Sequence, residues 1–216
     1  MKKKVLITGT GLGGLTTALR LATRGYEVVM LEKNKQAGGR LNQIKKDGFT
    51  FDTGPSFFSM SYEFKEFADD CGLKKLPFDF VELDPLYTVN FSDRPEKTYK
   101  LHKDISLLSE QFAEVEPDFK EKITKYLKKS GALYNDTVDK VIKTNFESHL
   151  HYLITLASVN PAHLPVLFKN FWQQVEKHFD SKEAQQLVSL IAFFLGRTPF
   201  DTSAVYTLLS HIEFVH

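Results

Sequence analysis

The first 32 residues alternate between two short apolar runs and one stretch of helical periodicity. Residues 4–8 form an apolar run that ends in glycines, and residues 12–24 carry apolar side chains at helical spacing before Gly25. Residues 27–31 form a second run, rich in Val and Leu, that ends at Glu32. Because a crossover helix separates the two runs, the second run predicts a buried strand parallel to the first. The pattern therefore predicts a complete βαβ unit by Glu32.

The pattern changes twice in the middle of the chain. Residues 33–55 are polar and dotted with glycines, which predicts a loop, and residues 60–71 have helical periodicity that Gly72 ends. Between residues 79 and 101 the apolar positions alternate, which predicts antiparallel strands. We therefore place a domain boundary near residue 75, between a segment of residues 1–75 and a segment of residues 76–216.

Beyond Asp104, a predicted N-cap, the pattern is helical almost to the end of the chain and predicts four or five helices. The clearest helix covers residues 184–195, with Gly196 at its C-terminal cap. It is apolar nearly all round, so we expect it to be buried or to line a hydrophobic tunnel. The fold class is therefore α/β: a Rossmann-like βαβ segment joined to an α+β, mostly helical segment.

An aromatic stripe at helical spacing lies just before that helix. A core position is the favoured interpretation, and a surface that faces a membrane or a lipid substrate is the alternative. The stripe comprises Phe168, Phe171, Trp172, Val175 and Phe179.

Composition excludes several classes of function. The 28 Lys and Arg residues nearly balance the 27 Asp and Glu residues, so charge gives no reason to expect a nucleic acid partner. The single cysteine, Cys71, cannot form an intramolecular disulfide, and we expect it to be a small buried residue in a protein of a reducing compartment. The apolar run at residues 5–7 is too short for a signal peptide. The longest apolar stretch falls short of the roughly 20 residues that cross a bilayer.

Residues 9–14, Gly-Thr-Gly-Leu-Gly-Gly, fit the pattern G-x-G-x-x-G between a predicted strand and a predicted helix. Gly9 allows the tight turn, Gly11 lets a diphosphate approach bare backbone, and Gly14 lets the helix and strand pack closely. The diphosphate would then lie at the helix N-terminus, where free amides favour negative charge. The motif predicts a dinucleotide-binding site.

Glu32 stands about 20 residues further on, at the end of the second strand, where a carboxylate can accept hydrogen bonds from ribose hydroxyls. A carboxylate there would also repel a 2′-phosphate. The position therefore favours FAD or NAD over NADP.

Gly38, Gly39 and Arg40 favour FAD over NAD. The Arg40 guanidinium can pair with phosphate oxygens, and the two glycines before it again allow close approach of the backbone. A second turn follows at residues 52–55.

Together these segments resemble the phytoene desaturase family of carotenoid enzymes. The resemblance is densest over residues 5–56, and the Phe-x-Phe-Asp-x-Gly-Pro stretch at residues 49–55 is its most specific part. It implies an FAD flavoprotein of the amine oxidase-like superfamily that removes hydrogen from a carotenoid precursor such as phytoene. It also implies that residues 1–75 are an FAD-binding segment and residues 76–216 a substrate segment. It further implies a lipophilic polyene substrate, work at a membrane surface, and a cytoplasmic location peripheral to the membrane.

The motifs and the resemblance together define the expected FAD-binding residues. Because the flavin supplies the reactivity of such enzymes, we assign no catalytic residue, and no spacing predicts a metal site. The expected cofactor-binding residues are Gly9, Gly11, Leu12, Gly13, Gly14, Glu32, Lys33, Gly39, Arg40, Gly54 and Pro55.

Members of this family are considerably longer than 216 residues, so we expect the chain to be the N-terminal part of such an enzyme. Three alternatives stay open: another amine oxidase-like flavoenzyme or a carotenoid isomerase, an NAD-binding dehydrogenase, and a non-catalytic helical binding module. Tyr99 and Lys103 match the spacing of the catalytic pair of short-chain dehydrogenases. However, Tyr99 falls in a predicted strand, and Leu15 stands where that family has glycine.

Overall fold

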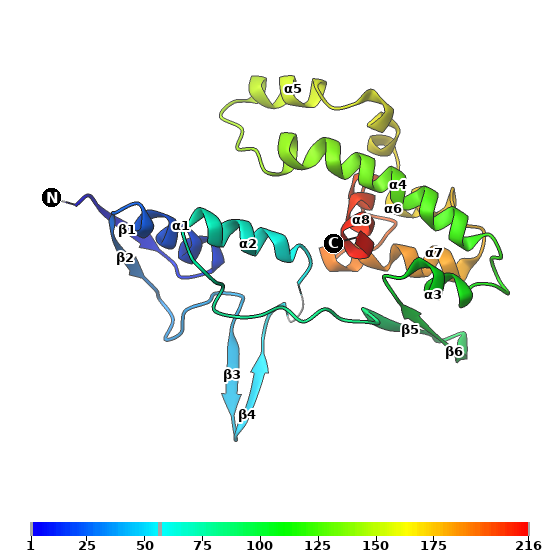
Figure 1. Cartoon of the computed structure of the whole chain (residues 1–216), viewed down its shortest axis with the longest axis horizontal. Helices are drawn as coiled ribbons and strands as arrows, with labels where there is room; N and C mark the ends of the chain where they lie inside the picture. The colour runs from blue at the N-terminus through cyan, green and yellow to red at the C-terminus, as the bar shows by residue number, and fades with distance from the viewer. Residues whose placement is uncertain (1, 56–57, 216) are drawn as a thin grey trace. The chain divides into compact units, whose positions relative to one another are not determined.

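The computed structural model describes residues 2–55 and 58–215, and the chain divides between Val81 and Glu82 into two compact units (Figure 1). Unit 1 contains the glycine-rich motif, and unit 2 contains most of the helices. That the division also separates an FAD-binding domain from a substrate domain stays a prediction.

Unit 1 begins with the predicted βαβ unit. Strand β1 (Lys4–Thr8), helix α1 (Leu12–Thr23) and strand β2 (Glu27–Leu31) follow in order, and the two strands pair in parallel from Lys4 opposite Glu27 to Thr8 opposite Leu31. The Gly9 amide donates to the Leu31 carbonyl oxygen at 2.7 Å, which joins the glycine turn to the end of β2. The βαβ prediction is confirmed.

The prediction that the second strand is buried is wrong. The three central residues of β2 are half-buried, and Leu31 at its end is exposed. In α1 only Ala18 is buried. Within the described residues β1 and β2 form a two-stranded sheet, so α1 covers a narrow surface and leaves the rest of the strands in contact with solvent.

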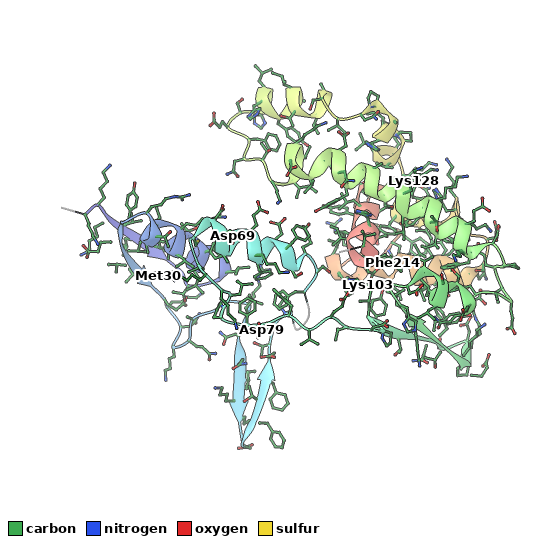
Figure 2. All side chains as sticks on the ribbon, viewed as in Figure 1. Met30, Asp69, Asp79, Lys103, Lys128 and Phe214 are labelled. Atoms are coloured by element: carbon green, nitrogen blue, oxygen red, sulfur yellow. The ribbon has the colours of Figure 1, made fainter. Side chains whose placement is uncertain are left out.

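A β-hairpin occupies part of the segment that the sequence predicted to be a loop. Strands β3 (Gln43–Lys46) and β4 (Phe49–Asp52) are antiparallel, and Asp47 and Gly48 between them both have positive φ, 52° and 83°. Asp-Gly with this geometry is the favoured two-residue hairpin turn. All eight strand residues are exposed, and Figure 2 shows side chains projecting from both strands of the hairpin.

Helix α2 (Ser61–Asp70) confirms the helix predicted at residues 60–71, and Gly72 follows it with the left-handed φ of 65°. Arg20 of α1 pairs with Asp70 at 2.8 Å, and its guanidinium lies over the Phe67 ring. Cys71 is buried and free, as expected.

Unit 2 begins with an antiparallel pair, β5 (Tyr87–Phe91) and β6 (Arg94–Leu101). The prediction of a strand at residues 79–83 is wrong. Phe80 instead packs in an aromatic cluster of unit 1, with its ring 5.4 Å from the rings of both Phe64 and Phe78. Alternation alone was misleading, because Phe80 packs on other rings and Val81 and Leu83 are exposed, so none of them pairs with a neighbouring strand.

Six α-helices follow among the described residues, more than the predicted four or five. Asp104 caps the first of them as predicted, accepting a hydrogen bond from the Ser106 amide at 2.7 Å. The helices are α3 (Ile105–Glu110), α4 (Phe119–Thr137), α5 (His149–Ala157), α6 (Phe171–Glu176), α7 (Lys182–Ser189) and α8 (Leu208–Val215).

Short helices of other types connect them. A π-helix, Val138–Ile142, continues α4, and 3₁₀ helices cover Pro161–Phe168, Leu190–Leu195 and Ala204–Thr207. The predicted helix at residues 184–195 is therefore split at Ser189, although Gly196 ends it in the left-handed conformation as predicted. No helix in the described part of the chain is both long and apolar enough to cross a bilayer.

The core of unit 2 is built from large aromatic and aliphatic side chains. Phe112 and Phe119 are fully buried, and their rings stack with centroids 4.2 Å apart. Phe214 of α8, labelled in Figure 2, belongs to the same cluster. Of the predicted aromatic stripe, Phe171, Val175 and Phe179 are fully buried, whereas Phe168 is 85% exposed.

Candidate functional site

The first helix begins with free backbone amides. Gly11 is the N-cap of α1, and no side chain caps the helix there. Within the described residues no protein acceptor binds the amides of Leu12, Gly13 and Gly14. These donors, at the positive end of the helix dipole, favour an anionic ligand.

An open hollow lies at this end of the β1–β2 sheet. The structure brings five of the predicted residues together in its lining, namely Gly9, Gly11, Glu32, Lys33 and Gly39. The rest of the lining is Thr8, Thr10, Leu31 and Asn34. The hollow is therefore bounded by bare backbone on one side and by the Glu32 carboxylate at the end of β2.

The glycine segment at residues 38–39 packs against the glycine motif at residues 9–14. The Gly38 amide donates to the Thr10 carbonyl oxygen at 2.8 Å, and Gly39 has the left-handed φ of 62°. A Cβ atom at Gly39 would come within 3.0 Å of the Gly11 Cα atom. Glycine is required at position 39 by this close approach as well as by its backbone conformation.

Gly14 has the packing role that the motif predicted. A Cβ atom there would overlap the carbonyl oxygen of Gly9, whereas a Cβ atom at the neighbouring Gly13 would meet nothing within 4 Å. Gly14 therefore allows the start of α1 to lie close to the turn at Gly9 that follows β1.

The Glu32 carboxylate is held by four hydrogen bonds. Its Oε2 atom accepts from the Thr10 amide at 2.9 Å and from the Thr10 hydroxyl at 2.6 Å. Its Oε1 atom accepts from the Asn34 amide at 2.9 Å and from the Asn34 side-chain nitrogen at 3.0 Å. These bonds, the one from the Thr10 hydroxyl first, lower the pKa of Glu32 to about 2, so the group is ionised at neutral pH.

The remaining predicted residues lie beside the hollow or outside its lining. Leu12 is exposed at the start of α1, and Arg40 is exposed directly after Gly39. Across residues 2–55 and 58–215 no ion pair of the Arg40 guanidinium is formed. Gly54 lies against the backbone of Arg40, where a Cβ atom would overlap the Arg40 carbonyl oxygen, and Pro55 follows it, exposed.

Sequence reasoning missed Thr10 and Asn34. The signal for Thr10 was a hydroxyl side chain directly after the first glycine of the motif, in the turn between β1 and α1. Asn34 stands two residues after Glu32, a spacing at which a side chain can bond locally.

The pair expected of a short-chain dehydrogenase is not assembled. Tyr99 lies in strand β6 as predicted and is fully buried, and Lys103 pairs with Glu82 at 2.6 Å. In the described residues no group of three or more metal-binding side chains comes together.

Comparison with known proteins identifies the family of the chain. The profile of the family described as "Flavin containing amine oxidoreductase" matches residues 12–197. The chain belongs to this family, and its cofactor is FAD.

Its relatives are carotenoid enzymes. A carotenoid 3,4-desaturase of Haloarcula japonica is 32% identical over 97% of the chain and 42% of its own length. A phytoene desaturase of Phycomyces blakesleeanus is 33% identical over 98% of the chain and 36% of its own length. The chain thus spans about two-fifths of the length of these curated relatives.

Solved structures show the same fold. A triple mutant of putrescine oxidase superposes with a TM-score of 0.58 and 18% identity over 96% of the chain and 41% of the oxidase. The described structure therefore has the fold of the FAD-binding flavin amine oxidases, and about half of its residues are helical.

Proposed function

We propose that the chain supplies the FAD-binding part of an oxidoreductase that desaturates a carotenoid precursor such as phytoene. The observation that carries the proposal is the hollow in unit 1, which is lined by Gly11, at the uncapped start of α1, and by the ionised Glu32. The names of the relatives, two of which are a carotenoid 3,4-desaturase and a phytoene desaturase, support the reaction class.

The hollow fits the adenosine diphosphate half of the cofactor. The amides of Leu12, Gly13 and Gly14 would bind the diphosphate, and Glu32 would accept hydrogen bonds from the ribose. Arg40, exposed and without an ion pair among the described residues, would pair with a phosphate oxygen. Gly9, Gly11 and Gly39 have no side chains that would block the approach of the cofactor to the backbone. Gly54 packs closely against the backbone of Arg40. Lys33, in the lining of the hollow, and Pro55 are the remaining residues of the proposed FAD-binding site.

Desaturation removes a hydride and a proton from neighbouring carbons; the bound flavin would supply the hydride acceptor, the proton would pass to water, and the protein would orient a polyene against the cofactor. None of the side chains in the hollow has to act as an acid or base for that reaction. The proposal therefore assigns binding and orientation to unit 1 and names no catalytic residue.

Retention of flavin by the purified chain, and by a version extended to the length of its relatives, tests the cofactor site. Glu32→Ala should weaken FAD retention on the order of tenfold, because a hydrogen bond to a charged group is lost. Glu27→Ala, at the other end of β2, is the matched control and should retain FAD as the wild type does. Tight binding of a nicotinamide cofactor without flavin would show that the assignment is wrong.

The reaction itself is tested by product analysis with the extended protein. Incubation with phytoene in lipid should give products with additional conjugated double bonds and coloured absorbance. A rearranged product without loss of hydrogen would favour a carotenoid isomerase, and oxidation of an amine would favour another amine oxidase-like flavoenzyme.

We also propose that a membrane surface meets the segment from α5 to the end of the following 3₁₀ helix. Several large apolar side chains are exposed there, and a polyene substrate would be dissolved in the membrane. These side chains are Leu150, Leu153, Ile154, Leu164, Leu167 and Phe168. Flotation with liposomes should be reduced by Leu153→Glu combined with Phe168→Glu and not by Glu121→Gln, a conservative exchange on the surface of α4. Equal flotation of both variants would exclude this surface.

A further inference from the structure

The two oxygen atoms of Glu32 have neighbours of different kinds. Oε2 is bonded by the amide and hydroxyl of Thr10, a residue that is only 8% exposed. Oε1 is bonded by the amide and the side-chain nitrogen of Asn34, which is exposed. One oxygen thus faces a buried donor and the other faces a donor in contact with water.

Four donors fill the acceptor positions of this carboxylate. An ionised carboxylate offers about four lone-pair positions, two on each oxygen. The Thr10 amide, the Thr10 hydroxyl, the Asn34 amide and the Asn34 side-chain nitrogen occupy them at 2.6 to 3.0 Å. A ribose hydroxyl can therefore donate to Glu32 only if one of these four hydrogen bonds breaks.

The free-energy cost of breaking the hydrogen bond to Glu32 differs among the donors. A buried Thr10 hydroxyl without its partner would leave an unsatisfied polar group, which is costly. The backbone amides are fixed by the chain. The exposed Asn34 side chain can rotate away and bond to water, so it is the donor that yields most easily.

We propose that Thr10 is a positioning residue that fixes Oε2, and that the Asn34 side chain is a placeholder that competes with a ribose hydroxyl for Oε1. The inference rests on the proposed adenosine diphosphate site and assigns opposite effects to the two residues. Thr10 raises the affinity for a ribose-containing ligand by holding the carboxylate in one orientation. Asn34 lowers that affinity, because its bond must break before the ribose binds.

The test uses the whole chain with ADP as the probe. The comparison ligand is 2′,3′-dideoxy-ADP, which lacks both ribose hydroxyls. Isothermal titration measures both affinities for the wild type, Asn34→Ala, Thr10→Val and Thr10→Ser. Val keeps the shape of Thr10 without its hydroxyl, and Ser keeps the hydroxyl. Gln36→Ala, which removes another exposed amide nearby, is the control for Asn34→Ala.

Asn34→Ala should bind ADP about three- to tenfold more tightly than the wild type, the range expected when one competing hydrogen bond is removed. It should bind dideoxy-ADP as the wild type does. Thr10→Val should bind ADP on the order of tenfold more weakly, with a smaller loss for dideoxy-ADP, and Thr10→Ser should restore most of the affinity.

A second readout follows Glu32 directly. The NMR signal of its carboxyl carbon, followed during an acid titration, should give a Glu32 pKa of about 2 in the wild type. The pKa should be higher in Thr10→Val. A variant with an unchanged pKa would show that the Thr10 hydroxyl does not hold the carboxylate.

Three results would overturn the inference. Unchanged or weaker ADP binding by Asn34→Ala would exclude the placeholder. Equal losses of ADP and dideoxy-ADP in Thr10→Val would show a general structural effect on the loop. If the wild-type chain binds neither ADP nor FAD, the proposed cofactor site fails and this inference fails with it, whereas wild-type binding without the predicted differences overturns only the inference.

Discussion

The two units of the chain are stabilised in different ways. Unit 2 encloses a cluster of large side chains, among them Phe112, Phe119 and Phe171, all fully buried. Among the described residues of unit 1 the buried ones are Thr10, Ala18, Ala68 and Cys71, all of them small. The unit that carries the candidate site is therefore the less densely packed of the two.

The difference teaches that the candidate site depends on backbone geometry more than on packing. Free amides, a close approach of two glycine segments and a carboxylate at a strand end can form where few side chains are buried. Apolar side chains of unit 1 are correspondingly exposed, at Leu6, Leu15, Leu31, Ile44, Phe49 and Phe51. Substitutions that affect packing and substitutions that affect backbone geometry should therefore have different effects in the two units.

The largest expected effect is in the core of unit 2. Phe112→Ala removes a fully buried ring that stacks on Phe119 and should lower the free energy of unfolding by about 3–5 kcal/mol. Phe49→Ala, at a position 65% exposed on the hairpin of unit 1, should change it by less than about 0.5 kcal/mol. Urea titration measures the free energy of unfolding of both variants. Similar losses would contradict the difference in packing between the two units.

The next effect depends on pH and on a contact between distant segments. The Tyr87 hydroxyl donates to Glu213 Oε1 at 2.7 Å, and burial raises the pKa of Glu213 to about 7. Because the unfolded state ionises at lower pH, the stability that protonated Glu213 contributes is present below pH 4.5 and is lost as pH rises to about 7. Wild-type stability should therefore fall across this window by up to about 3 kcal/mol relative to Glu213→Gln.

Thermal unfolding of both proteins at a series of pH values measures that difference. Glu110→Gln, at an exposed position of α3, is the control and should follow the wild type. If the stability of Glu213→Gln depends on pH in the same way as that of the wild type, the raised pKa of Glu213 is contradicted.

A smaller effect distinguishes two neighbouring glycines of unit 1. Gly14→Ala should destabilise the β1–α1 turn by about 1–3 kcal/mol, because its Cβ atom would overlap the Gly9 carbonyl oxygen. Gly13→Ala, with open space around it, should stabilise α1 by about 0.5–1 kcal/mol through helix propensity. Hydrogen exchange of the α1 amides measures both, and equal effects would show that the close approach does not constrain the loop.

Local signals in the sequence were sufficient for the features that depend on neighbouring residues. The βαβ order, the Asp104 cap and the glycine ends at Gly72 and Gly196 were predicted correctly. The Asp47-Gly48 turn was equally local and was overlooked. Errors arose where apolar periodicity has more than one solution, as at residues 79–83, where Phe80 packs on aromatic rings, and after Ser189, where the α-helix tightens to a 3₁₀ helix.

The glycine motif and the acidic residue at the strand end could be predicted from the order of residues, because both depend on backbone conformation and on short spacing along the chain. The bonds from Thr10 and Asn34 to the Glu32 carboxylate, and the bond from Tyr87 to Glu213, 126 positions away, became apparent from the folded chain alone. The physical reason is that a hydrogen bond depends on distance and direction in space, which the order of residues does not specify until the strands and helices have packed.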